Sequence, residues 1–454
     1  MEVLLGLMEY VKNYWVYSIW RENLRNVVKK CTYAIIEVKK GGRRREMLLQ
    51  FRIKNYKSFA EEAVLDMTAT SIREHASSLI DVNGNKVLPV AAIYGANASG
   101  KSNLLRAFGV MCGEVEGALV REVERKNPLI TSYYFDEEAR KQPTEFEVSL
   151  CIDNVEYCYG FTRDQKIVYE EWLFQKKYKK GTRAKEKTIY YRDQKKLVTE
   201  VVDTKEKQEI EFVYSMVSAG ELMLTALGRR KKSQYRKVYS WFSSNGMYQY
   251  YGNENEERVT NMMVPAMLGN NQELFNELKK VISLFDPDIC GLEVRKVVDG
   301  GFNSSYRLYS QHMDSSGRVI TTEFESESDG TKKLFSLMFT LITNIKFGVV
   351  LFIDELDAKL HPLILRYIIR LFTDPNKNTG KSQLVFSSHN LICLSSADLR
   401  RDEIWFVEKN KQKSELFSLY DFKEEDSSVR TDMNFGKNYL SGRFGAIPFQ
   451  ERED

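Results

Sequence analysis

The sequence predicts an α/β fold with a parallel core sheet, and three observations support this prediction. Residues 88–94 and 349–353 are apolar runs with the length and composition of strands that are buried on both faces, and residues 383–388, Gln-Leu-Val-Phe-Ser-Ser, read as another buried strand. A Gly-rich or polar segment follows each run, and residues 103–108 have the spacing of a helix. Because ligands bind outside the carboxyl ends of the strands in such sheets, we expect the functional residues in these segments.

The segment after the first run is the octapeptide Gly-Ala-Asn-Ala-Ser-Gly-Lys-Ser, residues 95–102, which matches the G-x-x-x-x-G-K-[ST] pattern. Gly95 and Gly100 permit a tight turn that points backbone N–H groups at phosphates. Lys101 would reach the β and γ phosphate oxygens, and the Ser102 hydroxyl would ligate Mg²⁺. A Gly-rich turn without a ligand is the alternative. The octapeptide predicts a P-loop NTPase that binds a nucleoside triphosphate with Mg²⁺.

The run at residues 349–353 ends in Asp354 and Glu355, so a buried strand would deliver two carboxylates to the edge of the sheet. Asp354 would support the metal ion, and Glu355 would act as the base that activates the attacking water. The alternative is a buried strand followed by a solvated acidic turn. Together with the phosphate loop, the pair predicts Mg²⁺-dependent hydrolysis.

Two further segments belong to the same prediction. His389 follows the run 383–388, where an imidazole could donate a hydrogen bond to the γ-phosphate, although it could also be a plain surface residue. Residues 327–331, Glu-Ser-Asp-Gly-Thr, precede a helix-like run, and a Ser-x-Gly loop at a helix start can bind an anion. The alternative is an ordinary N-capped helix with Ser328 or Thr331 as the cap.

The order of these motifs resembles the ABC-type ATPase heads of SMC, RecF, RecN and OLD proteins, and Asn97 gives the phosphate loop the variant usual in them. The resemblance implies ATP as the nucleotide and a dimer or higher even oligomer. Ser328 and Gly330 would then act on the nucleotide of the opposite subunit, with Asp357 in the loop that faces the dimer. Asp329 departs from the Ser-Gly-Gly signature of transporters, because it places a carboxylate where a phosphate is expected.

A narrower resemblance is to stand-alone prokaryotic AAA-type ATPases of the RloA kind, which are found near phage-defence genes. It rests on residues 47–59, 171–173 and 438–448 and spans roughly residues 47–449. It implies the sensor or motor subunit of an anti-phage system that acts through a separately encoded effector, such as a nuclease. The alternative is a RecF-like or SMC-like ATPase for DNA repair or DNA binding. A nuclease of the OLD kind would need a further Toprim domain after the head, which we do not expect.

Composition restricts the class of protein. Of the 454 residues, 43% are hydrophobic and 29% are charged, as in folded globular chains. The net charge of +4 is too small to imply nucleic-acid binding by itself. The six cysteines contain no C-x-x-C pair, which argues against a zinc site or a disulfide framework. We expect a cytoplasmic protein without a membrane span or a secretory signal.

The other elements follow from residue spacing and turn residues. From Met47 to about residue 80 we expect a strand, a turn at residues 55–58 and a second strand. Further strands are expected at residues 145–150, 156–161, 167–174, 188–191, 292–298, 306–311 and 319–324. The clearest helices span residues 222–237 and 272–285, and Pro362 is placed to open another.

We therefore expect an ABC-type ATPase head with a parallel core sheet, an antiparallel β lobe and an inserted helical lobe. The parts are an appendage or over-extended gene start (1–46), the first part of the head with the phosphate loop and β lobe (47–204), the inserted lobe (205–286) and the second part of the head (287–454). The rival interpretation of residues 1–46 is an amphipathic helix that binds a membrane or a partner.

Two basic segments are candidate contacts for nucleic acid. Lys176–Lys196 interleaves cations with Tyr178, Tyr190 and Tyr191, a mixture that suits phosphate contacts and base stacking. Arg229–Lys237 contains a second cluster of cations on the predicted helical lobe. For the first segment, the alternative is a solvated hairpin.

Overall fold

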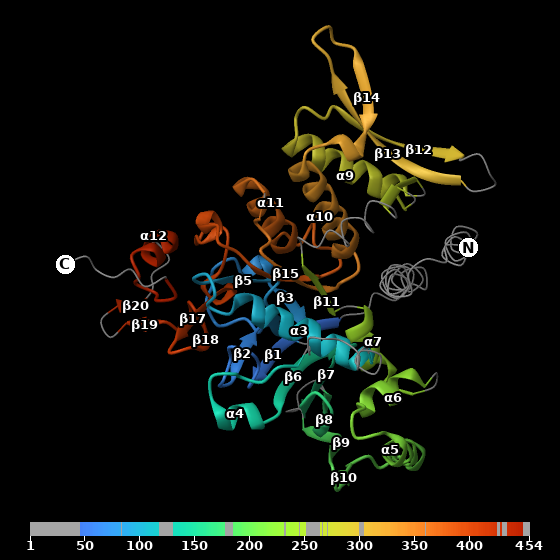
Figure 1. The fold of residues 1–454 in the computed structure, drawn as a ribbon, viewed down its shortest axis with the longest axis vertical. Coiled ribbons are helices and arrows are strands. Elements are labelled where there is room, and N and C mark those ends of the chain that lie inside the picture. The colour runs from blue at the N-terminus through green and yellow to red at the C-terminus, as the bar shows by residue number, and fades with distance from the viewer. Residues whose placement is uncertain are drawn as a thin grey trace. The chain divides into compact units, whose positions relative to one another are not determined.

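The structure is a computed structural model that describes residues 46–82, 84–117, 130–177, 185–230, 233–244, 246–250, 264–265, 267–269, 271–298, 304–358, 360–424, 427–428 and 434–447 (Figure 1). These residues belong to the second of two units, Arg44–Asp454, into which the chain divides. The predicted appendage lies outside the described residues except for Glu46. The boundaries predicted after residues 46, 204 and 286 stay predictions.

A six-stranded sheet forms the core, as the sequence predicts. In spatial order its strands are β11 (Gly246–Tyr250), β15 (Val350–Asp354), β16 (Gln383–Ser387), β5 (Val90–Tyr94), β17 (Ile404–Asn410) and β18 (Lys413–Ser418). Neighbouring strands are parallel except for the hairpin of β17 and β18. Every residue of β5, β15 and β16 is buried, which explains why these strands are continuous and largely apolar runs in the sequence.

Strand β11 differs from the sequence prediction, which places only helices between residues 205 and 286. Its five residues read Gly-Met-Tyr-Gln-Tyr and form no continuous apolar run. The strand pairs in parallel with β15, with Gly246 opposite Val350 and Tyr250 opposite Asp354. Its partner is therefore remote in the sequence, and local spacing does not reveal such a pairing.

The predicted antiparallel lobe is a seven-stranded sheet. In spatial order its strands are β10 (Leu197–Val198), β9 (Glu186–Asp193), β8 (Val168–Lys177), β7 (Val155–Arg163), β6 (Thr144–Ile152), β1 (Glu46–Lys54) and β2 (Ala63–Asp66). The strands predicted from residues 47 to 191 are thus confirmed. Smaller pieces in the first part of the chain are η1 (Ala76–Ser78), β3 (Ile80–Val82), β4 (Asn85–Val87) and α4 (Glu137–Lys141).

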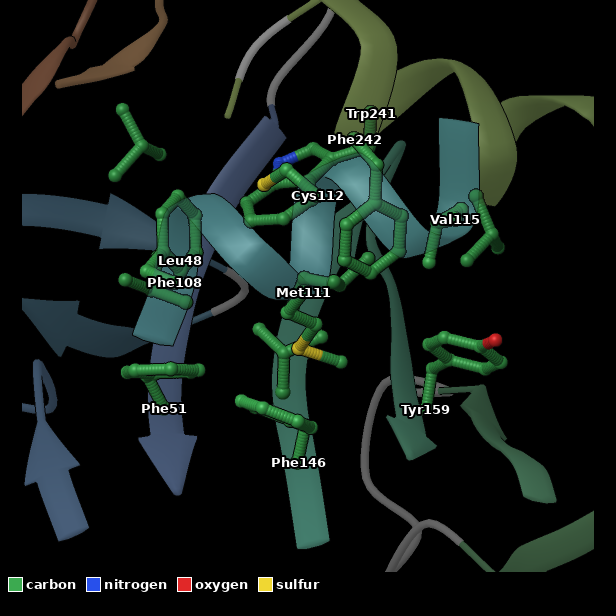
Figure 2. Packing of buried hydrophobic residues seen from close by; sticks show 14 of the residues in the cluster. Leu48, Phe51, Phe108, Met111, Cys112, Val115, Phe146, Tyr159, Trp241 and Phe242 are labelled. Atoms are coloured by element: carbon green, nitrogen blue, oxygen red, sulfur yellow. The ribbon is translucent and has the colours of Figure 1, made fainter. Parts of the chain in front are cut away.

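Helix α3 (Lys101–Glu116) lies between the two sheets and holds them together. The Phe108 ring stacks on Phe352 of β15 with the ring centroids 3.8 Å apart, and it meets Phe51 of β1 edge-to-face at 5.3 Å. Figure 2 shows Phe108 and Met111 of α3 among side chains of the antiparallel sheet. Because α3 begins at the phosphate loop, this packing fixes the loop against both sheets.

The opposite face of the core sheet is covered by α10 (Asp329–Ile345) and α11 (Pro362–Thr373) (Figure 1). Side chains of β15 alternate between the two faces: Phe352 packs in the cluster with α3, whereas Leu351 and Ile353 pack with α10 and α11. Helix α9 (Gln272–Phe285) contacts α10, and it confirms the helix predicted at residues 272–285.

The helix predicted at residues 222–237 is two helices, α6 (Met223–Arg229) and α7 (Arg236–Ser244). The two helices pack so closely that a Cβ atom added to Gly228 would lie 2.1 Å from the Cβ atom of Tyr239. Arg230 ends α6 in an extended conformation, with φ −73° and ψ 127°. Tertiary packing therefore outweighs the local helical spacing here.

The remaining elements lie between residue 204 and residue 440. They are α5 (Thr204–Met216), a three-stranded sheet of β12 (Gly291–Val298), β13 (Ser304–Met313) and β14 (Val319–Glu323), η3 (Phe324–Ser326), η4 (Leu391–Cys393), η5 (Arg401–Glu403), β19 (Lys423–Glu424), β20 (Ser427–Ser428) and α12 (Phe435–Leu440). Within the described ranges, no helix combines the length and apolar character needed to cross a membrane.

Candidate nucleotide-binding site

The loops that follow β5, β15 and β16 converge at one edge of the core sheet. The three strands are adjacent and parallel, so their carboxyl ends lie side by side. Backbone hydrogen bonds join the ends: Ser388 N–H donates to the Ile93 carbonyl (3.1 Å), and Leu356 N–H donates to the Ser387 carbonyl (3.1 Å). The segments that the sequence singles out thus meet at one place.

The phosphate loop has the backbone that its glycines predict. Gly95 and Gly100 adopt φ angles of +150° and +120°, which side chains rarely permit. A Cβ atom on Gly95 would lie 2.3 Å from the Val407 carbonyl oxygen. Gly100 is the N-cap of α3 and has no side chain with which to cap it. The N–H groups of Asn103 and Leu104 donate to the Gly100 carbonyl, so those of Lys101 and Ser102 are the ones that could bind an anion.

Lys101, at the start of α3, is buried, and its ammonium donates hydrogen bonds back to the phosphate loop. Nζ donates to the carbonyl oxygens of Gly95 (2.8 Å) and Ala96 (3.0 Å). Burial lowers the pKa of Lys101 from its ordinary value, and the carboxylates of Asp354 and Glu355 oppose this shift. Phosphate oxygens could replace the two carbonyls as acceptors of this ammonium.

Asp354 is the last residue of β15, and its carboxylate is 1% exposed. Oδ1 accepts a hydrogen bond from the Ser387 hydroxyl at 2.6 Å. Oδ2 is buried and has no hydrogen-bond partner among the described residues. Burying a carboxylate oxygen without a partner destabilises the folded state unless a cation binds that oxygen. Asp354 therefore fits its predicted role as a Mg²⁺ ligand. Ser102, in the first turn of α3, would supply a second oxygen.

Glu355 follows Asp354 with a left-handed backbone, at φ +49°. Its N–H group donates to the Ser387 hydroxyl at 2.8 Å, and its carbonyl accepts from Ala358 N–H at 3.0 Å. This turn takes the chain out of the strand immediately after the metal-binding position. Its carboxylate is only partly buried, as a base that meets a water molecule must be.

Asp357 and His389 lie next to each other. The His389 backbone N–H donates to Asp357 Oδ2 at 3.2 Å, while Oδ1 of Asp357 is buried without a partner within the described part of the chain. The His389 residue is exposed at the edge of the sheet. Its predicted contact with the γ-phosphate and the dimer-facing role of Asp357 both stay predictions.

The predicted signature loop begins α10 as a capped helix. The Ser328 hydroxyl accepts a hydrogen bond from Thr331 N–H at 3.1 Å, which is the alternative of an ordinary N-cap. Asp329 is exposed and pairs with Lys332 of its own helix at 3.2 Å. The action of Ser328 and Gly330 on a second subunit stays a prediction.

Ser387 is a site residue that the sequence analysis did not identify. It lies at the end of β16 and contacts both Asp354 and Glu355. A hydroxyl at the end of the strand next to the two carboxylates was the available signal, but it has no distinctive local motif.

The contacts that the two basic segments make in the structure support nucleic-acid binding less than their composition does. Tyr190 is fully buried, and its hydroxyl donates to Glu171 at 3.0 Å, so the prediction that it stacks on a base is wrong. Tyr190 and its neighbour Ile189 are both buried in β9, next to a bulge opposite Leu173 and Phe174. Lys176 pairs with Glu156 and Glu186, and Tyr191 donates to Glu170 at 2.5 Å. Tyr178 lies outside the described residues.

The second basic segment is also engaged within the chain. Arg229 donates to the Glu116 carbonyl at 2.7 Å, Arg230 pairs with Glu209 at 2.9 Å, and Lys237 pairs with Asp153. Residues 231–232 lie outside the described ranges. Contact of either segment with nucleic acid therefore stays a prediction.

Comparison with known proteins gives one family match. The family described as "AAA domain, putative AbiEii toxin, Type IV TA system" matches residues 90–395. Curated protein sequences include no match to the chain.

Similar solved structures include three SMC heads. The SMC head domain from Thermotoga maritima has 15% identity and a TM-score of 0.37, over 82% of this chain and 98% of that one. The Smc head with an extended coiled coil from Pyrococcus furiosus, bound to the C-terminal domain of ScpA, has 14% identity and a TM-score of 0.41, over 82% of this chain and 96% of that one. The Smc head with a coiled coil and joint from Pyrococcus yayanosii has 11% identity and a TM-score of 0.42, over 88% of this chain and 99% of that one.

Proposed function

Because this chain belongs to the AAA-domain family that matches its residues 90–395, we propose that it binds ATP with Mg²⁺ and hydrolyses it. The observation that carries the proposal is the buried Asp354 oxygen that has no partner among the described residues, at the sheet edge where the phosphate loop also lies. A buried carboxylate in this state is costly in a purely structural role, whereas a metal–nucleotide complex would satisfy it.

Each residue of the site has a role that follows from its position. The N–H groups of the loop and of the first turn of α3 would bind the phosphates, and Lys101 would exchange its two carbonyl acceptors for phosphate oxygens. Ser102 and Asp354 would hold Mg²⁺, which neutralises developing charge on the phosphates. Glu355 would take a proton from the attacking water, and His389 would donate to the γ-phosphate.

We further propose that two copies complete the site, with Ser328 and Gly330 of one subunit facing the nucleotide of the other. The exposure of His389 supports this proposal, since a second subunit could cover it. The pairing of Asp329 with Lys332 offsets part of the carboxylate charge within its own helix, which supports a place for this loop near phosphate.

In the cell, we propose that the protein is the cytoplasmic sensor or motor subunit of an anti-phage system. This role rests on the resemblance of residues 47–59, 171–173 and 438–448 to ATPases of the RloA kind. ATP binding and hydrolysis would change the conformation of the chain, and a separately encoded effector, such as a nuclease, would respond to that change.

The enzymatic part is tested by phosphate release from ATP in the presence of Mg²⁺. The wild-type protein should release phosphate, and Lys101→Ala should neither bind a fluorescent ATP analogue nor release phosphate. Lys86→Ala is the matched control, because Lys86 is half-exposed and pairs with Asp81 on the separate β3–β4 hairpin. Unchanged ATP binding by Lys101→Ala would show that the site is wrongly assigned.

A further inference from the structure

The hydroxyl of Ser387 lies between the two residues that the proposed reaction depends on most. Ser387 is fully buried at the end of β16, and Oγ is 2.6 Å from Asp354 Oδ1 and 2.8 Å from the Glu355 nitrogen. A carboxylate can only accept and a backbone N–H can only donate, so the direction of both bonds is fixed. Ser387 gives its one proton to Asp354 and accepts the N–H of Glu355.

The first of these bonds orients the Asp354 carboxylate. Because Oδ1 is occupied by the Ser387 proton, the carboxylate is held with Oδ2 free, and Oδ2 is the oxygen without a partner among the described residues. A carboxylate held by one oxygen presents the other to a cation in a fixed direction. Ordered ligands around a metal ion depend on hydrogen bonds of this kind from neighbouring groups.

The second bond stabilises the turn at Glu355. A left-handed backbone is unfavourable for a residue with a Cβ atom, and φ at Glu355 is +49°. The N–H bond to Oγ and the bond from Leu356 N–H to the Ser387 carbonyl (3.1 Å) tie this turn to the end of β16. Strained backbone of this type persists where the surrounding structure holds it, and it is common at active sites.

We propose that Ser387 is a positioning residue that sets the metal-binding oxygen of Asp354 and the backbone of the base Glu355 in one arrangement. The proposal rests on the proposed function. One hydroxyl links the two groups, so a displacement of either carboxylate residue is transmitted to the other. The pair would therefore act as a single unit on the end of β16.

Ser387→Ala tests the proposal, with Ser382→Ala as the matched control. Ser382 is also a fully buried serine, directly before β16 at its other end. Its hydroxyl donates to backbone carbonyls, those of Asn344 (3.1 Å) and Ile345 (3.3 Å), and it accepts the backbone N–H of Val349 (3.1 Å). Both variants lose the hydrogen bonds that a buried serine hydroxyl donates and accepts, so both should lower the unfolding midpoint.

The variants should differ at the site. Ser387→Ala should lower kcat for ATP about 10- to 100-fold, which corresponds to one lost hydrogen bond to a charged group, with a smaller change in KM. It should also raise the Mn²⁺ concentration needed for half-maximal binding with a non-hydrolysable ATP analogue, measured by electron paramagnetic resonance of free Mn²⁺. Ser382→Ala should leave both quantities at the wild-type value. Ser387→Thr, which retains the hydroxyl, should restore most of kcat.

Three results would overturn the proposal. The first is a Ser387→Ala variant with wild-type kcat and Mn²⁺ dependence, and the second is an equal loss of kcat in Ser382→Ala. The third is a wild-type protein that binds no Mn²⁺ with the analogue. A wild-type protein that binds Mn²⁺ with the analogue but hydrolyses no ATP would refute the proposed function alone, and the Mn²⁺ comparison would still decide the role of Ser387.

Discussion

Gly95→Ala should destabilise the protein more than a Gly→Ala substitution in a turn where the added Cβ atom meets no neighbouring atom. Gly95 has φ +150°, and an added Cβ atom would lie 2.3 Å from the Val407 carbonyl oxygen and 2.9 Å from the Ser99 hydroxyl. Val407 belongs to β17, whose backbone cannot yield without disturbing its pairing with β5. The substitution therefore combines an unfavourable backbone with a steric clash.

The structure offers a control that separates these two costs. Gly317 lies in the turn between β13 and β14 with φ +79°, and a Cβ atom there would meet nothing within 4 Å. A left-handed backbone costs alanine about 1–2 kcal/mol, which both variants carry. Overpacking adds about 1–3 kcal/mol, which applies only at Gly95. The unfolding free energy should fall by about 1–2 kcal/mol for Gly317→Ala and about 2–5 kcal/mol for Gly95→Ala.

Urea unfolding followed by tryptophan fluorescence measures both variants, compared at equal m-values. In the folded state, Gly95→Ala should also weaken binding of a fluorescent ATP analogue, because the displaced loop no longer directs its N–H groups at the phosphates. Gly317→Ala should bind the analogue as the wild type does. Equal midpoints for the two variants would show that the loop does not lie against β17 as described.

Two further predictions concern the rest of the chain. Deleting residues 1–45 should leave ATP hydrolysis and the unfolding midpoint unchanged, because the first strand of the antiparallel sheet begins at Glu46; aggregation or loss of activity would place the deleted segment in the folded core. Expression of this chain alone should cause little toxicity and no cutting of plasmid DNA, whereas co-expression with the product of the adjacent gene should cause an effect that Lys101→Ala abolishes; Mg²⁺-dependent DNA cleavage by the purified chain would favour a nuclease of the OLD kind instead.

The parts of the site that the sequence predicts are those with a local signature. The phosphate loop is a contiguous motif, and β5, β15 and β16 are recognisable because burial on both faces requires apolar side chains along each strand. Once these strands are known, their parallel pairing brings Lys101, Asp354 and Glu355 to one edge. No long-range information is needed beyond the topology common to α/β sheets.

The features that the sequence analysis missed depend on contacts between distant residues. Ser387 is an ordinary serine until the register of β15 and β16 places it beside Asp354. Strand β11 is recognisable only by its pairing with β15. Tyr190 reads as an aromatic residue in a basic segment, but its hydroxyl belongs to a buried network with Glu171 and Arg192. In each case a contact with a residue that is distant in the sequence, rather than the local spacing, determines the role of the residue or strand.

The central claim is that Glu355 activates water for ATP hydrolysis at this site, and Glu355→Gln tests it most directly. The amide retains the shape of the side chain but cannot take a proton. The variant should bind an ATP analogue as tightly as the wild type, while its rate of phosphate release in a single turnover should fall about 10²- to 10⁴-fold. With ATP and Mg²⁺ it should also elute as a trapped dimer in size-exclusion chromatography. Wild-type turnover by Glu355→Gln would contradict the account.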